Sequence, residues 1–163
     1  MRIATELKQN LIESIVDGEG FRLVIFTQGC IHHCKGCHNK TTWKVDGGID
    51  YPVEEIASHI LSKYQKHRNR YAGLTISGGD PLLQRDELKE LLDILKSTEP
   101  DMNIWVYTGY ETEEVLTTFN DLVKYVDTFV TGKFVQEKMD YECKFRGSSN
   151  QELLRTKELK EVL

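Results

Sequence analysis

Three of the four cysteines, Cys30, Cys34 and Cys37, lie within eight residues of one another. Their CxxxCxxC spacing lets one loop wrap three thiolates around a single centre, which favours a polynuclear iron-sulfur cluster. A 4Fe-4S cluster ordinarily has four cysteine ligands, so this loop would leave one iron open to another ligand. We therefore expect a 4Fe-4S cluster with three protein ligands.

Two other interpretations of these cysteines stay open on spacing alone. A zinc ion could take the three thiolates together with a histidine, the candidates being His32, His33 and His38. Zinc sites usually combine two cysteine pairs from separate segments, however, and the sequence contains no second pair. The cysteines could also be structural or redox-active thiols. The remote Cys143 is more typical of a small packing residue than of a ligand.

A glycine-rich turn, residues 77–82 (SGGDPL), is the second group that could do chemistry. Taken alone, it is typical of a glycine turn followed by a helix cap. In a protein with a cluster, the same residues suit a ligand site, because Gly78 and Gly79 permit close approach of the backbone and Asp80 can pair with a cation. The presence of the cysteines favours this second interpretation.

The segments that must position these groups begin with a hairpin. Residues 10–16 are β-rich, residues 17–20 (DGEG) supply a turn, and residues 21–27 (FRLVIFT) have a buried-strand pattern. This second strand ends just before Cys30. The cysteine loop is therefore expected where a strand stops.

Helix and strand patterns alternate after the cysteines. The expected elements are a helix capped by Asp50 with Pro52 in its first turn and an apolar stripe from Val53 to Tyr64, a strand at 73–76, a helix with Leu88, Leu91, Leu92 and Leu95 on one face, a strand at 103–107, a helix at 111–119 and a strand at 125–130. Strands separated by helices are most simply parallel, and the turns after them meet at one edge of the sheet, where ligands bind.

The fold class that follows is α/β. Four strand-helix units are too few for a closed barrel of eight, so we expect an open or partial (β/α) barrel of mostly parallel strands. The amino-terminal β-hairpin and the carboxy-terminal tail should cover its edges. The length of 163 residues corresponds to a single domain, residues 1–163.

Composition argues against several classes of function. The 21 Lys and Arg residues against 26 Asp and Glu give a net charge of -5, which provides no overall attraction to nucleic acid. No apolar run approaches the ~18 residues needed to span a bilayer. The first residues also lack the pattern of a secretory signal. We expect a cytoplasmic protein that binds neither nucleic acid nor a membrane.

The motifs together resemble those of the radical S-adenosylmethionine enzymes, in which CxxxCxxC directly follows the first strand. The likeness extends to the activases of glycyl-radical enzymes at residues 16–22 (VDGEGFR), 26–30 (FTQGC), 37–39 (CHN) and 42–43 (TW). Within that group, residues 77–82 and 145–151 (FRGSSNQ) are similar to the branch that activates anaerobic ribonucleotide reductases. The motifs occur in the expected order over residues 10–151, so chance agreement is improbable.

The resemblance implies roles for the matching residues and a partial barrel of the radical S-adenosylmethionine type. The three clustered cysteines would hold three irons, and the amino and carboxylate groups of S-adenosylmethionine would chelate the fourth. The backbone of Gly78 and Gly79 and the carboxylate of Asp80 would receive the methionyl ammonium.

Two positions depart from the wider family. Gly36 stands where many members have an aromatic residue near adenine, although glycine is usual in this branch, so we assign the adenine contact to His38. Thr131 stands where an acidic residue is expected, which puts an acidic role there in doubt. Lys133 is a candidate contact for the cofactor carboxylate, and Thr108 is a further cofactor-binding candidate.

The implied function is activation of the anaerobic reductase. Its large subunit would be the protein substrate, and a reduced flavodoxin- or ferredoxin-type protein would donate the electron. A homodimer is one assembly that the resemblance allows. The alternatives are an activase of another glycyl-radical enzyme, such as pyruvate formate-lyase, and an iron-sulfur electron-transfer or zinc-binding module.

Overall fold

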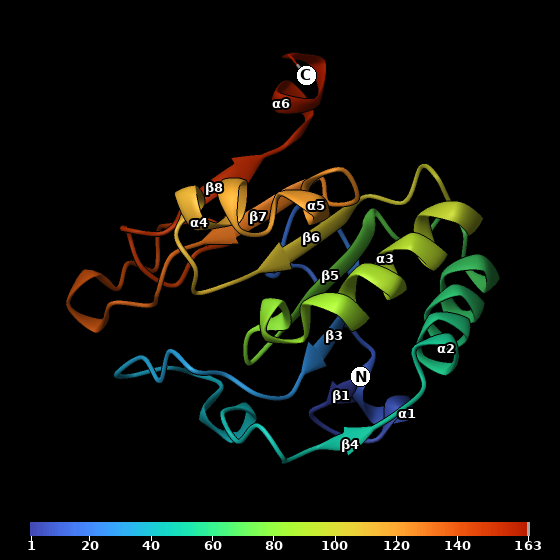
Figure 1. Cartoon of the computed structure of the whole chain (residues 1–163), viewed down its shortest axis with the longest axis horizontal. Coiled ribbons are helices and arrows are strands. Elements are labelled where there is room, and N and C mark those ends of the chain that lie inside the picture. Colours follow the sequence, from blue (N-terminus) through green and yellow to red (C-terminus); the bar gives the residue numbers. More distant parts are fainter. Residues whose placement is uncertain (163) are drawn as a thin grey trace.

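The computed structural model describes residues 1–162, whose strands form one open, mixed sheet (Figure 1). The strands are β1 (Arg2–Ile3), β2 (Ile12–Ser14), β3 (Arg22–Thr27), β4 (Ile49–Asp50), β5 (Gly73–Gly78), β6 (Ile104–Tyr107), β7 (Thr128–Thr131) and β8 (Glu152–Arg155). The α-helices are α1 (Leu7–Asn10), α2 (Val53–Lys66), α3 (Arg85–Thr98), α4 (Thr112–Thr117), α5 (Asn120–Val123) and α6 (Lys157–Val162). Short 3-10 turns η1 (Lys40–Thr42), η2 (Pro81–Gln84) and η3 (Gln136–Lys138) complete the elements.

The centre of the sheet is parallel, as the alternation of patterns predicted. The strand order is β4-β1-β3-β5-β6-β7-β8, and β3, β5, β6 and β7 pair in parallel. Every residue of β5 is buried, as expected for a parallel strand covered on both faces. The two ends of the sheet, β4 and β8, do not pair with each other among the described residues, so the sheet is not closed.

Antiparallel strands cover the edges of this parallel centre. The predicted hairpin is present as β2 paired with β3, and the carboxy-terminal tail contributes β8, which pairs with β7. The first strand of the hairpin is shorter than expected because Asn10 ends α1 instead of starting a strand. The side-chain amide of Asn10 instead pairs with the backbone of β3, donating to Phe26 O (2.9 Å) and accepting from Phe26 N (2.6 Å).

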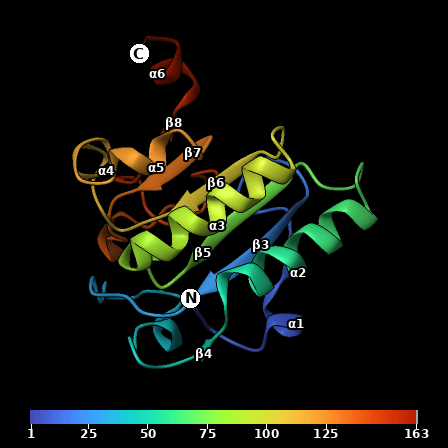
Figure 2. The same ribbon diagram turned by 45° about the vertical axis from the view of Figure 1, so that its right-hand side comes forward.

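Helices α2 and α3 cover one face of the sheet (Figures 1 and 2). The predicted apolar stripes face the core, with Ile56 and Ile60 of α2 and Leu88 and Leu91 of α3 fully buried. The predicted cap is wrong, because Pro52 and not Asp50 occupies the N-cap position of α2.

Asp50 is instead the last residue of β4. Its carboxylate accepts a hydrogen bond from the amino group of Met1 at 3.0 Å. The pairing of β1 with β4 brings the two residues together, and neither strand was predicted. Both strands are two residues long, too short to show a period.

The opposite face of the sheet is built around a buried arginine. Arg22 donates from Nε to Thr75 Oγ1 (2.9 Å) and from its Nη atoms to Glu19 O, Leu74 O and Asn103 O (2.9 to 3.0 Å). Burial lowers the pKa of Arg22 to about 10. Thr75 Oγ1 in turn donates to Asp17 O (2.5 Å), so this group of bonds ties the hairpin turn to the sheet.

Two predicted boundaries shift in the structure. The last parallel strand, β7, begins at Thr128 and not at residue 125, because α5 and the turn after it occupy the preceding residues. Strand β5 extends to Gly78, two residues beyond the predicted end. In residues 1–162, no helix combines the length and the hydropathy needed to cross a bilayer.

Candidate functional site

The cysteine loop, residues 29–43, leaves the carboxyl end of β3 at the edge where the parallel strands end (Figure 1). Its two ends are hydrogen-bonded to each other, from Gly29 N to Thr42 O (2.6 Å) and from Cys30 N to Trp43 O (3.0 Å). The threonine-tryptophan pair therefore closes the base of the loop.

The glycine-rich turn after β5 packs directly on this base. Asp80 N donates to Gly29 O at 2.8 Å, and Gly79 N donates to Thr27 O at 3.1 Å. A Cβ at Gly79 would overlap Gly29 O, and one at Gly78, whose φ is +118°, would overlap the backbone of Thr27. Both glycines are needed because two chain segments touch here.

Backbone N–H groups face the three clustered thiols. The donors are His32 and His33 for Cys30, Phe134 for Cys34, and Asn39 for Cys37 at 3.4 Å. Hydrogen bonds of this kind favour the thiolate, the form that ligates iron. The donor set therefore fits an iron-sulfur cluster.

Burial and hydrogen bonding act in opposite directions on the pKa values of the Cys30 and Cys34 thiols. Burial raises the pKa of Cys30, against the effect of its N–H donors. Burial also raises the pKa of Cys34, while the N–H of Phe134 and the positive charge of Lys133 act to lower it. Lys133 thus lies within electrostatic reach of the loop, on the segment after β7.

The cysteines are not gathered around a single ion. None of the four forms a disulfide, and among the side chains that the structure describes, residues 1–159, no group of three or more His, Cys, Asp or Glu could hold one metal ion. Cys143, which we expected as a packing residue, is only partly buried.

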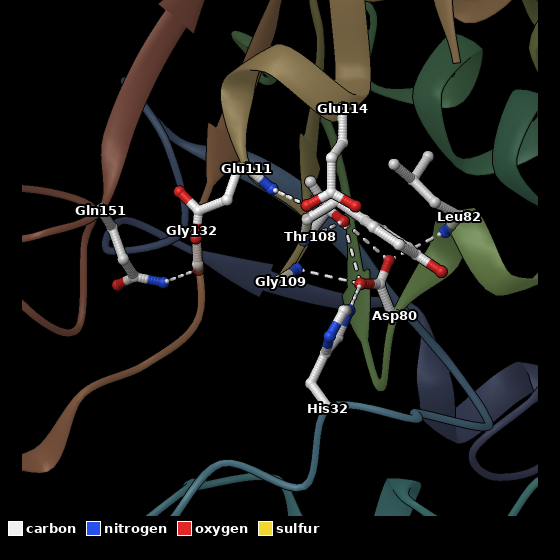
Figure 3. A network of polar contacts seen from close by, with 10 residues as sticks. His32, Asp80, Leu82, Thr108, Gly109, Glu111, Glu114, Gly132 and Gln151 are labelled. Carbon is white, nitrogen blue, oxygen red and sulfur yellow. Dashed lines mark hydrogen bonds and ion pairs between the residues drawn. The ribbon is translucent and has the colours of Figure 1, made fainter. Parts of the chain in front are cut away.

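Asp80 lies at the centre of a network at this edge (Figure 3). Its carboxylate is buried and accepts hydrogen bonds from Leu82 N (3.0 Å), Thr108 Oγ1 (2.9 Å to each oxygen), Gly109 N (2.9 Å) and His32 Nε2 (2.5 Å). The bond to Leu82 N caps η2, the structural role that the motif indicates by itself. Thr108, a predicted cofactor contact, bonds to Asp80.

His32 is one of the histidines that the sequence offered as a fourth ligand for zinc. The structure directs its Nε2 to Asp80, and its ring packs edge-on against Tyr110 with 4.8 Å between ring centroids. Burial raises the pKa of Tyr110, and the negative charge of Asp80 adds to this effect. Nothing in the local sequence predicts the contact, because 48 residues separate the two partners.

Asn39 is a further site residue without a predicted role. Its amide Nδ2 donates to Gly78 O at 3.4 Å, while its backbone N–H faces Cys37. It therefore connects the third cysteine to the glycine-rich turn. Its place in the CHN motif was the available signal.

Of the other predicted cofactor contacts, His38 lies within the cysteine loop and Lys133 on the segment after β7. The ring of His38 packs against Phe134 with 5.6 Å between centroids, and Lys133 is exposed. His38 also lines a cleft of about 600 Å³ together with Tyr107 and Cys143.

The walls of the cleft come from two segments far apart in sequence. One wall is the hairpin turn, residues 15–17, and the other is the segment 139–147. The FRGSSNQ motif anchors the second segment: Tyr107 donates to Phe145 O (2.6 Å), and Gln151 Nε2 donates to Gly132 O at 2.9 Å (Figure 3). The motif thus fastens the tail to the ends of β6 and β7.

Comparisons with known proteins agree with this arrangement. The family model described as "4Fe-4S single cluster domain" matches residues 16–154. Proteins named anaerobic ribonucleoside-triphosphate reductase-activating protein are similar over most of the chain. The protein of Vibrio cholerae is 37% identical over 139 residues, covering 84% of this chain and 89% of its own length. That of Haemophilus influenzae is 37% identical (88% and 93%), and that of Enterobacteria phage T4 is 37% identical (85% and 86%).

Proposed function

The chain belongs to the family of anaerobic ribonucleoside-triphosphate reductase-activating proteins, and from this we propose that it generates the glycyl radical of such a reductase. The observation that carries the proposal is the cysteine loop, with three thiols facing backbone N–H donors beside the glycine-rich turn. The names of the relatives favour this reductase over pyruvate formate-lyase, and the family description favours iron-sulfur over zinc.

Cys30, Cys34 and Cys37 would hold a 4Fe-4S cluster, with S-adenosylmethionine at its open iron. When bound and reduced, the cluster would supply one electron for the reductive cleavage of S-adenosylmethionine, the chemistry by which a glycyl radical would be generated on the reductase. The chain's own residues would bind and orient the cofactor. As the resemblance implies, the turn at Gly78 and Gly79 would bring its backbone to the cofactor.

The remaining candidate cofactor contacts would lie around the same cofactor site. His38 would contact the adenine and Lys133 the cofactor carboxylate. The ends of β5, β6 and β7 would form the carboxyl edge of a partial barrel of the radical S-adenosylmethionine type. The protein would work in the cytoplasm, with a flavodoxin- or ferredoxin-type electron donor and the large subunit of the reductase as its substrate.

The test is anaerobic reconstitution with iron and sulfide, followed by electron paramagnetic resonance of the reduced protein with and without S-adenosylmethionine. We expect a reduced 4Fe-4S signal that changes when S-adenosylmethionine is added, and a glycyl radical when the reductase is then mixed in. A cluster indifferent to S-adenosylmethionine would favour an electron-transfer module, and zinc in place of iron would contradict the proposal.

Two cysteine variants make the test specific. Cys34→Ala should abolish both the 4Fe-4S cluster and the glycyl radical, because it removes one of three ligands. Cys143→Ala is the matched control and should retain the wild-type iron and sulfide content. Full activation by Cys34→Ala, or loss of iron in Cys143→Ala, would overturn the proposed ligand set.

A further inference from the structure

The contact between His32 and Asp80 joins the cysteine loop to the sheet. The side chains are only 6% and 1% exposed, and His32 Nε2 lies 2.5 Å from Asp80 Oδ2. Because a carboxylate accepts hydrogen bonds, we assign the proton of this contact to His32 Nε2. It is a link between the interior of the loop and the end of β5, additional to the backbone bonds at the base of the loop.

The acceptor positions of the Asp80 carboxylate are occupied by donors from the protein. A carboxylate offers about four acceptor positions. Here Leu82 N and Thr108 Oγ1 bond to Oδ1, while His32 Nε2, Gly109 N and again Thr108 Oγ1 bond to Oδ2. A cofactor ammonium could reach these oxygens only by displacing a donor that the protein supplies.

The fold also reserves space for the His32 ring. A Cβ at Gly109 would overlap the His32 ring. The backbone of Gly109 lies outside the left-handed region that favours glycine. Glycine at position 109 is therefore explained by the room that the His32 ring needs, and not by the backbone conformation. The His32 ring lies between Gly109 and the Asp80 carboxylate (Figure 3). The ring of Tyr110 packs edge-on against it.

We propose that Asp80 and His32 are positioning residues: the His32–Asp80 pair holds the cysteine loop at a fixed distance from the Gly78–Gly79 backbone, and the Asp80 carboxylate does not bind the cofactor directly. This assignment rests on the proposed function, because the distance that the His32–Asp80 pair fixes would be the distance between the cluster and the S-adenosylmethionine site. It replaces the cation-pairing role that the sequence predicts for Asp80.

The first test uses the protein without its cluster. Trypsin can cut after Lys35, an exposed residue within the loop, and mass spectrometry identifies that cut. In His32→Leu and in Gly109→Ala, whose added methyl group displaces the His32 ring while the Asp80 side chain is unchanged, cleavage after Lys35 should be about tenfold faster or more, because the hydrogen bond between His32 and Asp80 is lost. His32→Gln, whose amide can still donate, should restore most of the protection.

A matched control is His33→Asn. His33 is in the same loop but is exposed and stacks on Trp43, with 4.6 Å between ring centroids. Asparagine tolerates its positive φ of 48°. Its cleavage rate should stay within about twofold of the wild type, since surface changes usually matter little. Equal rates for the His32→Leu variant and the wild type would overturn the positioning role.

The second test uses the reconstituted protein. Reduced His32→Leu should keep its iron content but need about tenfold more S-adenosylmethionine for the same change in its electron paramagnetic resonance signal, with His32→Gln close to the wild type. If the Asp80 carboxylate receives the cofactor ammonium, removing His32 should leave the affinity unchanged or raise it, which would overturn the proposal. Failure of the wild type to assemble a cluster would instead contradict the proposed function, and the trypsin result would stand separately.

Discussion

On one side of the cysteine loop, the buried Asp80 carboxylate accepts hydrogen bonds from four residues, whereas on the other side His38 lines an open cleft of about 600 Å³. The first side consists of short polar contacts between elements of the sheet. The second is bordered by exposed side chains, among them Val16 and Tyr141. The difference suggests a division of labour, in which one side fixes the geometry of the loop and the other leaves it accessible.

The largest effect should come from removing the centre of the fixed side. Asp80→Ala leaves the buried donors of Thr108, Gly109 and Leu82 without their acceptor, so we expect a loss of about 2–4 kcal/mol in the free energy of unfolding. Urea denaturation of the cluster-free protein measures it. Asp140→Ala, on the exposed side, should change stability by less than about 0.5 kcal/mol. Similar losses in the two variants would remove the distinction between the sides.

A smaller loss of stability should follow from removing the hydrogen bonds that hold the hairpin turn, which forms one wall of the cleft. Arg22→Met fills much of the same volume but removes the donors to Glu19 O, Leu74 O and Asn103 O, which should cost about 1–3 kcal/mol. Because Thr75 and Arg22 together hold the hairpin turn, hydrogen exchange should rise in residues 15–20. Unchanged exchange there would show that the cleft wall does not depend on Arg22.

Removing the cluster with a chelator should separate the two sides by their mobility. If the three thiols hold the proposed cluster, residues 31–38 should lose protection from hydrogen exchange by about tenfold, because the thiols would then no longer share a centre. Residues 78–80 and 108–110 should keep theirs, since Asp80 holds them without the cluster. Equal loss at all three segments would mean that the cluster, and not Asp80, organises this edge.

The smallest effect concerns an ion pair outside the fixed side, between Arg85 and Asp121 at 2.8 Å. Burial opposes ionisation of Asp121, but the hydrogen bond and charge of Arg85 more than offset it, so the pKa of Asp121 lies below its usual value. A lowered pKa contributes stability above the unfolded value of 3.8, which is lost as the pH falls through the folded value.

Asp121→Asn should therefore lower the free energy of unfolding at pH 7 by less than about 1 kcal/mol, as is usual for pairs near the surface. The difference from the wild type should fade below about pH 4. Urea denaturation at several pH values measures this. A difference that persists at low pH would assign the effect to packing instead of charge.

Local patterns predicted the parts of the fold that carry a period. The stripe of Leu88, Leu91, Leu92 and Leu95 and the buried run of β3 are visible in the sequence because burial on one face or on both leaves a repeated apolar signal. Strands β1 and β4 carry no such signal. They exist because each lies beside a partner that is distant in sequence.

The same limit applies to the candidate site. The CxxxCxxC spacing and the glycine-rich turn identified its two halves, and parallel strands brought them to one edge. The contacts of Asp80 could not be predicted, because two of its donors, Thr108 and His32, are 28 and 48 residues away in the sequence. A motif can indicate that a carboxylate is important without indicating which donor it serves.

The Asn10 amide has a consequence for association between molecules. Between the pairings of β3 with β1 and β2, the amide accepts from Phe26 N and donates to Phe26 O, which also accepts from Ala4 N, so the amide is the partner of the Phe26 N–H. Unpaired strand backbone of this kind is a template on which another chain can add a strand and start aggregation. By pairing with the Phe26 N–H, one side-chain amide thus occupies a place where another chain could otherwise bond to the strand that leads into the cysteine loop.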